Sequence, residues 1–199
     1  MSLYRLLENP AVYRASQTVL APGMDAILTR ELGKMVAGIP SDAKALDVGC
    51  GPVSWLWKFG MKPAGLDILH SYTTRFLARG GSCVTASAAA IPFASDSFDL
   101  VFSYALLHHL PDELAQQTVG EMIRVVKPKG SVIIFDPVLP RAAWRRPIAW
   151  ALCKLDRGHF IRPQPVLEAK ILGGSGRANT RRVTHSYLGK EGVLCRLKK

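Results

Sequence analysis

The chain has 199 residues, of which 48% are hydrophobic and 21% charged, as in an ordinary globular protein with one core. No apolar run reaches the roughly 18 residues that a membrane-spanning helix needs. The four cysteines are scattered without a CxxC pair, which argues against a metal centre or a disulfide framework and favours free thiols in the reducing cytoplasm.

The first 37 residues have apolar side chains at helical spacing, so we expect helices there, divided by Pro10 and by the Ala21-Pro22-Gly23 turn. We expect residues 1–40 to form a helical segment, whose position before the first expected strand makes it a candidate lid. The pattern then changes to short apolar runs separated by helical stretches. The expected strands are residues 45–48, 64–67, 83–86 and 98–104, and the expected helices are residues 53–59 and 72–78.

Further along the chain, residues 112–126 have the apolar face of a helix, and the β-branched run 131–135 predicts a strand. Residues 142–155 and 166–172 read as helices, and residues 182–188 and 192–197 as a closing antiparallel pair. Strands that alternate with helices predict right-handed βαβ units and a parallel sheet. We therefore expect one α/β domain over residues 41–199.

A glycine loop follows the first expected strand, in the run Asp47-Val48-Gly49-Cys50-Gly51. Ligands of doubly wound sheets bind at the carboxyl ends of the strands, and glycine lets the backbone approach them. Asp67 ends the next strand, 20 residues after Asp47, where an acid can accept hydrogen bonds from ribose hydroxyls. The loop therefore predicts a nucleoside-containing cofactor.

Two classes of cofactor share this layout. Dinucleotide-binding loops have a third glycine where this chain has Ser54, followed by the bulky Trp55. Asp47, two residues before Gly49, suits a ligand with a positive end better than a pyrophosphate. A sulfonium cofactor that also carries an amine is favoured over a nicotinamide.

Taken together, these segments resemble the small-molecule class I S-adenosylmethionine-dependent methyltransferases over most of the chain. The matching segments are residues 46–51, 65–68, 91–93, 97–101, 106–110 and 121–130. Residues 155–162 also resemble a bacterial subgroup of that family. The resemblance implies a Rossmann-like, doubly wound, seven-stranded sheet, mostly parallel with an antiparallel C-terminal hairpin, and S-adenosylmethionine as cofactor.

The resemblance also implies which residues hold that cofactor. Asp47, Gly49 and Gly51 correspond to positions along its methionine part, Asp67 to the ribose contact and Ile68 to a position beside the adenine. The full expected set is Asp47, Gly49, Cys50, Gly51, Asp67, Ile68, Ser87, Ala88 and Tyr104.

The chain departs from the family pattern at two positions. Val53 stands where the family usually has glycine, and Ser87 stands where an acid usually meets the adenine amino group. A lost charge-assisted hydrogen bond can cost about 1.5–3 kcal/mol. A protein that keeps the fold without catalysing methyl transfer is therefore an alternative reading.

Candidate catalytic residues follow the fourth strand. His109 is a candidate base for an acceptor that must lose a proton, with Tyr104 beside it, whereas we expect His108 to pack. No metal is expected. The sequence lacks the Asn/Asp-Pro-Pro-aromatic motif and the Pro-Cys nucleophile of base-methylating enzymes, so we expect a small or lipid-like acceptor, methylated at oxygen.

The charge is uneven along the chain: residues 141–199 hold 14 Lys and Arg against three acidic residues, and residues 1–140 are balanced. Such an excess indicates an anionic partner or only a solvated basic face. Arginine and tryptophan alternate in residues 141–157, which suits peripheral contact with a membrane or a cap over an acidic acceptor. An RNA substrate is a weaker alternative, and the sequence specifies no oligomeric state.

Overall fold

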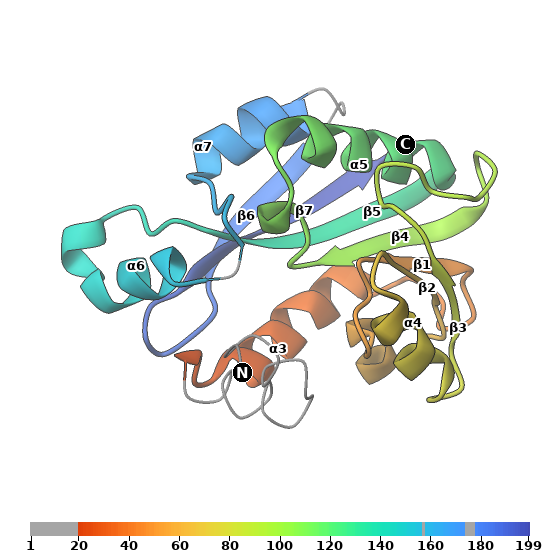
Figure 1. The fold of residues 1–199 in the computed structure, drawn as a ribbon, viewed down its shortest axis with the longest axis horizontal. Helices are drawn as coiled ribbons and strands as arrows, with labels where there is room; N and C mark the ends of the chain where they lie inside the picture. The colour runs from red at the N-terminus through yellow and green to blue at the C-terminus, as the bar shows by residue number, and fades with distance from the viewer. Residues whose placement is uncertain (1–19, 157, 174–177) are drawn as a thin grey trace.

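The computed structural model describes residues 20–156, 158–173 and 178–199. Within them, seven strands form one sheet in the order β3-β2-β1-β4-β5-β7-β6 (Figure 1). The strands are β1 (Ala45–Val48), β2 (Ala64–Asp67), β3 (Ser82–Thr85), β4 (Phe98–Tyr104), β5 (Val126–Val138), β6 (Ala178–Thr184) and β7 (Glu191–Lys198). β1 to β5 are parallel, and β7 runs antiparallel to β5 and β6. The expected fold class is confirmed.

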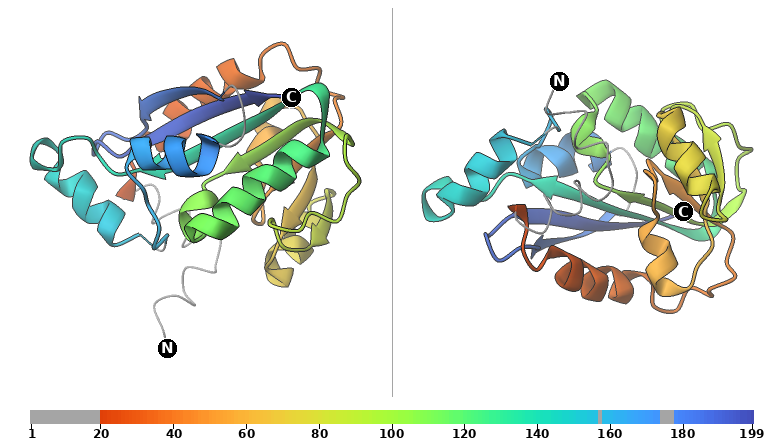
Figure 2. Two further views of the ribbon diagram at one scale, coloured as in Figure 1. Left: turned by 90° about the horizontal axis from the view of Figure 1, so that it is seen from above. Right: turned by 60° about the horizontal axis from the view of Figure 1, so that its bottom comes forward.

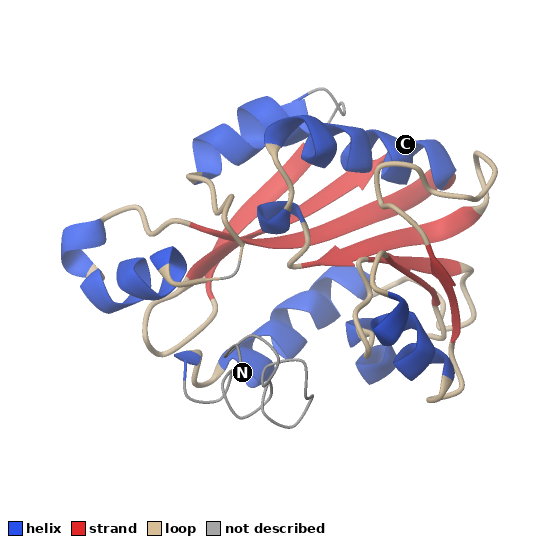
Figure 3. Cartoon of the chain, in the orientation of Figure 1, coloured by secondary structure: helices blue, strands red, loops and turns tan. Residues whose placement is uncertain are grey.

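Helices cover both faces of this sheet (Figures 2 and 3). One face carries α3 (Met24–Val36), η1 (Trp55–Phe59) and α4 (His70–Leu77), and the other carries α5 (Asp112–Val125), α7 (Gln164–Val166) and η4 (Leu167–Leu172). The remaining helical segments are η2 (Leu107–His109), η3 (Ala143–Arg145) and α6 (Pro147–Lys154). No described helix has the length and apolarity to cross a membrane.

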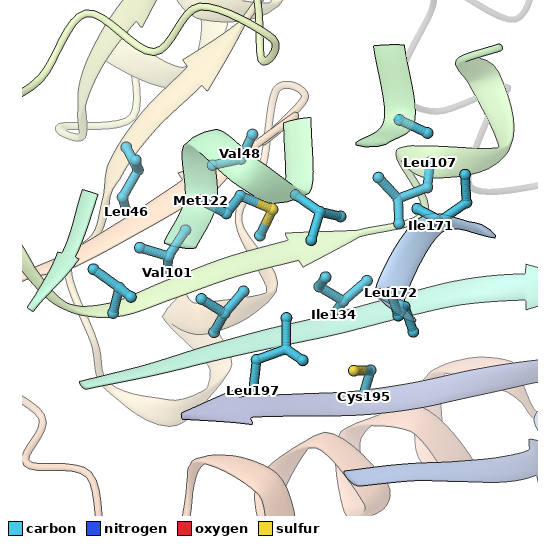
Figure 4. Close-up of a cluster of buried hydrophobic side chains, with 14 of the residues drawn as sticks. Leu46, Val48, Val101, Leu107, Met122, Ile134, Ile171, Leu172, Cys195 and Leu197 are labelled. Atoms are coloured by element: carbon cyan, nitrogen blue, oxygen red, sulfur yellow. The ribbon is translucent and has the colours of Figure 1, made fainter. Parts of the chain in front are cut away.

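The larger core cluster lies under α5 and η4 (Figure 4). Val101 of β4 and Ile134 of β5 meet Met122 of α5 there, and Leu172 and Leu197 extend the cluster toward β7. Full burial of each such side chain contributes about 1.5–3 kcal/mol. This packing fixes the strands and therefore the edge at which they end.

The opposite face is packed by α3, which buries Leu28 and Leu32 against Phe102 and Ile133 of the sheet. The described part of the expected N-terminal lid is thus a packed layer of the domain. Residues 1–19, the rest of that expected segment, lie outside the described residues.

Several elements differ in extent from the sequence expectation, and three of the differences are instructive. β5 begins at Val126, before the expected stop at Pro128-Lys129-Gly130, with Lys129 in the left-handed region (φ 67°). β6 begins at Ala178 and ends at Thr184, four residues earlier at each end than expected. The expected helix over residues 53–59 is a 3₁₀ turn that begins only at Trp55.

Candidate functional site

The glycine loop is held against β2 by backbone hydrogen bonds. The N–H groups of Gly49 and Cys50 donate to the carbonyl oxygen of Leu66, at 2.7 and 3.1 Å. Gly49 has φ 72°, and a Cβ there would lie 2.9 Å from Leu106 in the segment after β4. Gly51 has φ 58°, but a Cβ there would meet nothing within 4 Å. Glycine at position 49 therefore permits close packing, and the backbone at position 51 borders open space.

Asp67 ties the loop to the end of β2. Its Oδ2 accepts a hydrogen bond from the Gly51 N–H and its Oδ1 accepts one from the Leu69 N–H, both at 2.9 Å. Each oxygen of an ionised carboxylate has a second acceptor site. Asp67 is thus oriented by the backbone and can still accept hydrogen bonds from a diol in the space beside Gly51.

Asp47 is the buried acid of the site. Its Oδ2 accepts a 2.5 Å hydrogen bond from the Ser54 hydroxyl, and no described basic side chain pairs with it. Burial raises the pKa of Asp47 to about 7 against the lowering effect of the Ser54 bond, and the nearby Asp67 adds to the rise. A cationic ligand group beside this carboxylate would favour its charged form.

The Cys50 side chain belongs to the packing under the loop. Its Sγ lies 3.6 Å from Sγ of Cys83 on β3, and both sulfur atoms lie within 3 Å of where a Cβ on Gly65 would stand. Burial raises the pKa of the Cys50 thiol, which disfavours a thiolate nucleophile. Position 50 therefore offers its backbone to the site.

The other expected cofactor residues follow β2 and β3 at the same edge. Ile68 is 70% exposed, an apolar side chain directly after Asp67. Ser87 is exposed, and its hydroxyl accepts a hydrogen bond from the Ala89 N–H at 3.2 Å, while Ala88 packs on the core. The strand register aligns Asp67 with Thr85, so these segments lie side by side.

The two candidate catalytic residues lie at the end of β4 (Tyr104) and in η2 after it (His109), in different surroundings. The Tyr104 ring stacks between Trp55 and Phe135, at centroid distances of 4.8 and 5.2 Å. His109 is exposed at the end of η2, with its ring 4.1 Å from that of the buried His108. Nδ1 of His108 lies 3.1 Å from Asp136, which fixes His108 as part of the packing.

Sequence reasoning missed two contributors to the site. Ser54 was noted only as a replacement for glycine, yet its hydroxyl both donates to Asp47 and accepts from the Leu56 N–H as the cap of η1. Trp55 joins the glycine loop to Tyr104. The one available signal was a serine at the start of a helical segment, which is a common cap.

Among the described residues, no cluster of three or more histidine, cysteine, aspartate or glutamate side chains could hold a metal ion. Within the described residues, the site instead consists of the buried Asp47, which has no cationic partner there, of Asp67, which the backbone orients, and of the backbone at Gly51, which borders open space. This set fits a ligand with a positive end and a ribose.

Comparison with known proteins agrees with this geometry. The family described as "Methyltransferase domain" matches residues 46–134, which run from β1 through the glycine loop into β5. Residues 46–134 thus form a methyltransferase domain of the class I S-adenosylmethionine-dependent type. The resemblance drawn from the sequence motifs is thereby confirmed, and the family's cofactor is S-adenosylmethionine.

Two curated methyltransferases illustrate the breadth of acceptors among the relatives. The tRNA (carboxymethyluridine(34)-5-O)-methyltransferase of Arabidopsis thaliana is 31% identical over 136 residues, which cover 64% of this chain and 33% of the plant enzyme. The demethylmenaquinone methyltransferase of Bacillus velezensis is 32% identical over 124 residues, which cover 56% of this chain and 52% of that enzyme. This chain thus spans about a third to a half of the length of these relatives.

A solved structure extends the likeness to the whole fold. A methyltransferase from Thermotoga maritima superposes with a TM-score of 0.70 at 14% identity, covering 99% of this chain and 100% of that chain. At this identity the agreement concerns the fold alone. It includes the C-terminal strands that lie outside the family match.

Proposed function

We propose that this methyltransferase transfers a methyl group from S-adenosylmethionine to an oxygen atom of a small or lipid-like acceptor. The observation that carries the cofactor assignment is Asp47, a buried carboxylate with a raised pKa and no described cation beside it. Perturbed acids in a loop of this kind mark ligand sites. Its four free, scattered thiols suit the cytoplasm as compartment.

The division of labour among the cofactor residues follows from their contacts. Asp47 would hold the amine of the methionine part, and Asp67 the ribose hydroxyls. Gly51 leaves room for the ligand, and Ile68 offers an apolar surface for the adenine. When bound, the cofactor supplies a methyl group attached to a positively charged sulfur.

The acceptor side rests on Tyr104 and His109. The stack of Trp55, Tyr104 and Phe135 forms an apolar aromatic wall next to the glycine loop, which suits a small apolar or lipid-like acceptor. His109, exposed beyond this wall, would take the proton that an oxygen acceptor loses. Its role is that of a base held in place by the stacked His108 ring.

A tRNA acceptor is the second candidate. It is favoured by the excess of basic residues after position 140 and by the plant relative that modifies tRNA. Binding through phosphates would weaken steeply with salt. A salt-independent or absent interaction with tRNA would exclude this candidate.

Calorimetric titration with S-adenosylhomocysteine tests the cofactor assignment. We expect binding in the micromolar range, and at least hundredfold weaker binding by Asp67→Ala and Asp67→Asn, because charge-assisted hydrogen bonds contribute about 1.5–3 kcal/mol each. Asp67→Asn keeps the side-chain shape and one of the two backbone hydrogen bonds, whereas Asp67→Ala loses both, so thermal unfolding of the two variants separates lost recognition from loop collapse. The exposed Asp42→Ala is the control.

Absence of binding by the wild-type chain, or equal binding by the Asp67 and Asp42 variants, would overturn the cofactor assignment and favour a non-catalytic protein. Transfer of a radioactive methyl group to a lipid extract or to bulk tRNA then separates the two acceptors. His109→Asn should lower transfer to the lipid extract without changing cofactor binding. Unchanged transfer would remove His109 from the reaction.

A further inference from the structure

A helical arm projects from the sheet between β5 and β6. It comprises η3 and α6, residues 142–155, and we call it the α6 arm. In Figure 1 the arm lies apart from both helical layers, on the side to which the arrowhead of β4 points. That is the carboxyl edge of the parallel strands, where the glycine loop also lies. The arm thus shares an edge with the candidate functional site.

The outer face of the α6 arm is apolar. Ala149 and Cys153 are its buried side chains, one helical turn apart. Ile148, Ala151 and Leu155 follow at three- and four-residue spacing on the opposite side of the helix, where Ile148 is 59% and Leu155 81% exposed. Trp144 of η3 is 77% exposed. A surface helix normally presents polar residues outward, so this face indicates a binding surface.

Most basic side chains of the C-terminal region are used within the fold. The ion pairs are Arg146–Glu191, Arg162–Asp112, Lys170–Asp112, Arg181–Glu31, Arg182–Glu191, Lys190–Asp156 and Lys199–Asp96. The Arg196 guanidinium donates to Ser131. The described basic residues of the region that remain without an ion pair are Arg141, Arg145, Lys154, Arg196 and Lys198. Three of these five lie in or directly before the α6 arm.

The free cations of the arm lie beside its tryptophans. The Arg145 guanidinium is 4.6 Å from the Trp144 ring centroid, and the Lys154 ammonium is 5.5 Å from that of Trp150. Exposed tryptophan with adjacent arginine and lysine matches the boundary between lipid headgroups and acyl chains. The positive charges complement anionic headgroups, and the apolar side chains would enter the boundary region.

A groove of about 390 Å³ adjoins the base of the arm. Arg145, Arg146 and Ile148 line it on the arm, and it is also lined by Thr184 at the end of β6 and by Tyr187 in the segment between β6 and β7. Its guanidinium and hydroxyl groups can donate hydrogen bonds to a phosphate. The groove therefore extends the basic and apolar surface of the α6 arm toward the sheet.

We propose that the α6 arm docks this protein onto an anionic membrane surface, with Trp144, Ile148 and Leu155 at the headgroup boundary and Arg145 and Lys154 against phosphates. The bound partner is a phospholipid bilayer. Docking goes beyond methyl transfer and does not require it.

Flotation of the full chain with vesicles tests this proposal. We expect binding to phosphatidylcholine vesicles that contain phosphatidylglycerol, and weak binding to phosphatidylcholine alone. Ile148→Asp/Leu155→Asp should weaken partitioning about a hundredfold, because burial of each side chain contributes on the order of tenfold. The matched control is Leu77→Asp/Leu114→Asp, which makes the same charge change at exposed leucines of α4 and α5.

Loss of binding only in the arm variant supports the proposal. No binding of the wild-type chain to anionic vesicles, or equal loss in the arm and control variants, would overturn it. A wild-type dimer that the arm variant converts to a monomer, with no lipid binding, would instead assign the face to a second copy. S-adenosylhomocysteine titration of both variants keeps the two proposals separable, since failure of cofactor binding leaves the vesicle result unaffected.

Discussion

The two halves of the molecule treat buried charge in opposite ways. At the glycine loop, Asp47 is buried with the Ser54 hydroxyl as its side-chain partner among the described residues, and its pKa is raised to about 7. At the start of β7, Glu191 is also buried, though less completely, and it pairs with Arg182 and Arg146 and accepts a hydrogen bond from the Arg141 N–H. Burial alone would raise the pKa of Glu191, but the two guanidiniums hold it below its ordinary value.

The difference separates structural charges from ligand-binding ones. A buried carboxylate that is paired with cations of the same chain belongs to the fold. A buried carboxylate without a cationic partner destabilises the fold until a ligand supplies the cation. Along the sequence, the basic excess of the C-terminal region indicates an external anionic partner, but in the structure many of these cations pair with acids of the same chain. Most of the described basic residues of the region without an ion pair lie near the α6 arm.

The largest effect is expected on the paired side. Glu191→Gln should lower the free energy of unfolding by about 3–5 kcal/mol, because it leaves Arg182 buried without its counter-charge. Urea unfolding at neutral pH measures this. The comparison variant is Lys170→Ala, which breaks an exposed ion pair and should cost about 0.5 kcal/mol or less. Equal losses in both variants would remove the distinction between buried and exposed pairs.

Asp47→Asn should have the opposite effect and raise the free energy of unfolding. The folded-state pKa of Asp47 is about 7, above the ordinary aspartate value, so its stability contribution is lost as pH rises from about 4 through 7. The variant should therefore gain about 2–4 kcal/mol over the wild type at pH 8 and nothing at pH 4. Thermal unfolding of the cofactor-free chain across this range checks the sign. A loss of stability at pH 8 would show that the Asp47 charge is already compensated.

The smallest effect concerns affinity. If Asp47 must be ionised to hold the cofactor amine, affinity for S-adenosylhomocysteine should rise about tenfold between pH 6 and pH 8, as the ionised fraction grows around a pKa of about 7. Calorimetric titration at both values measures it. Asp47→Asn should bind weakly with no such rise, and His109→Asn should keep the rise. A pH-dependence lost in the histidine variant instead would assign it to His109.

The sequence predicted the regular part of the fold closely. β4 occupies the expected residues Phe98–Tyr104, and α5 ends within a residue of the expected Val126. Both have strong periodicity and turn residues at their ends, which are local signals. The motif residues from Asp47 to Asp67 were located for the same reason, since strand, loop and acid are adjacent along the chain.

The errors lie where distant segments decide the structure. Pro128-Lys129-Gly130 looked like a stop, yet β5 passes through it because Val126 pairs with Phe98 of β4 across an irregular register. The Ser54 bond to Asp47 and the Trp55 stack on Tyr104 join loops from neighbouring strands, which no periodicity reveals. The internal pairing of the basic C-terminal region was likewise invisible, because Arg181 meets Glu31 and Arg162 meets Asp112 from far apart in sequence.

The position of β7 between β5 and β6 sets an order of assembly. On the ribosome, β6 is synthesised before the strand that it pairs with, so it has no place in the sheet until β7 has emerged. Buried side chains of β7, Leu194 and Cys195 among them, then close both core clusters at once. A chain cut before Glu191 would therefore lose two strands rather than one, and it would expose the whole flank of β5 as an unpaired edge.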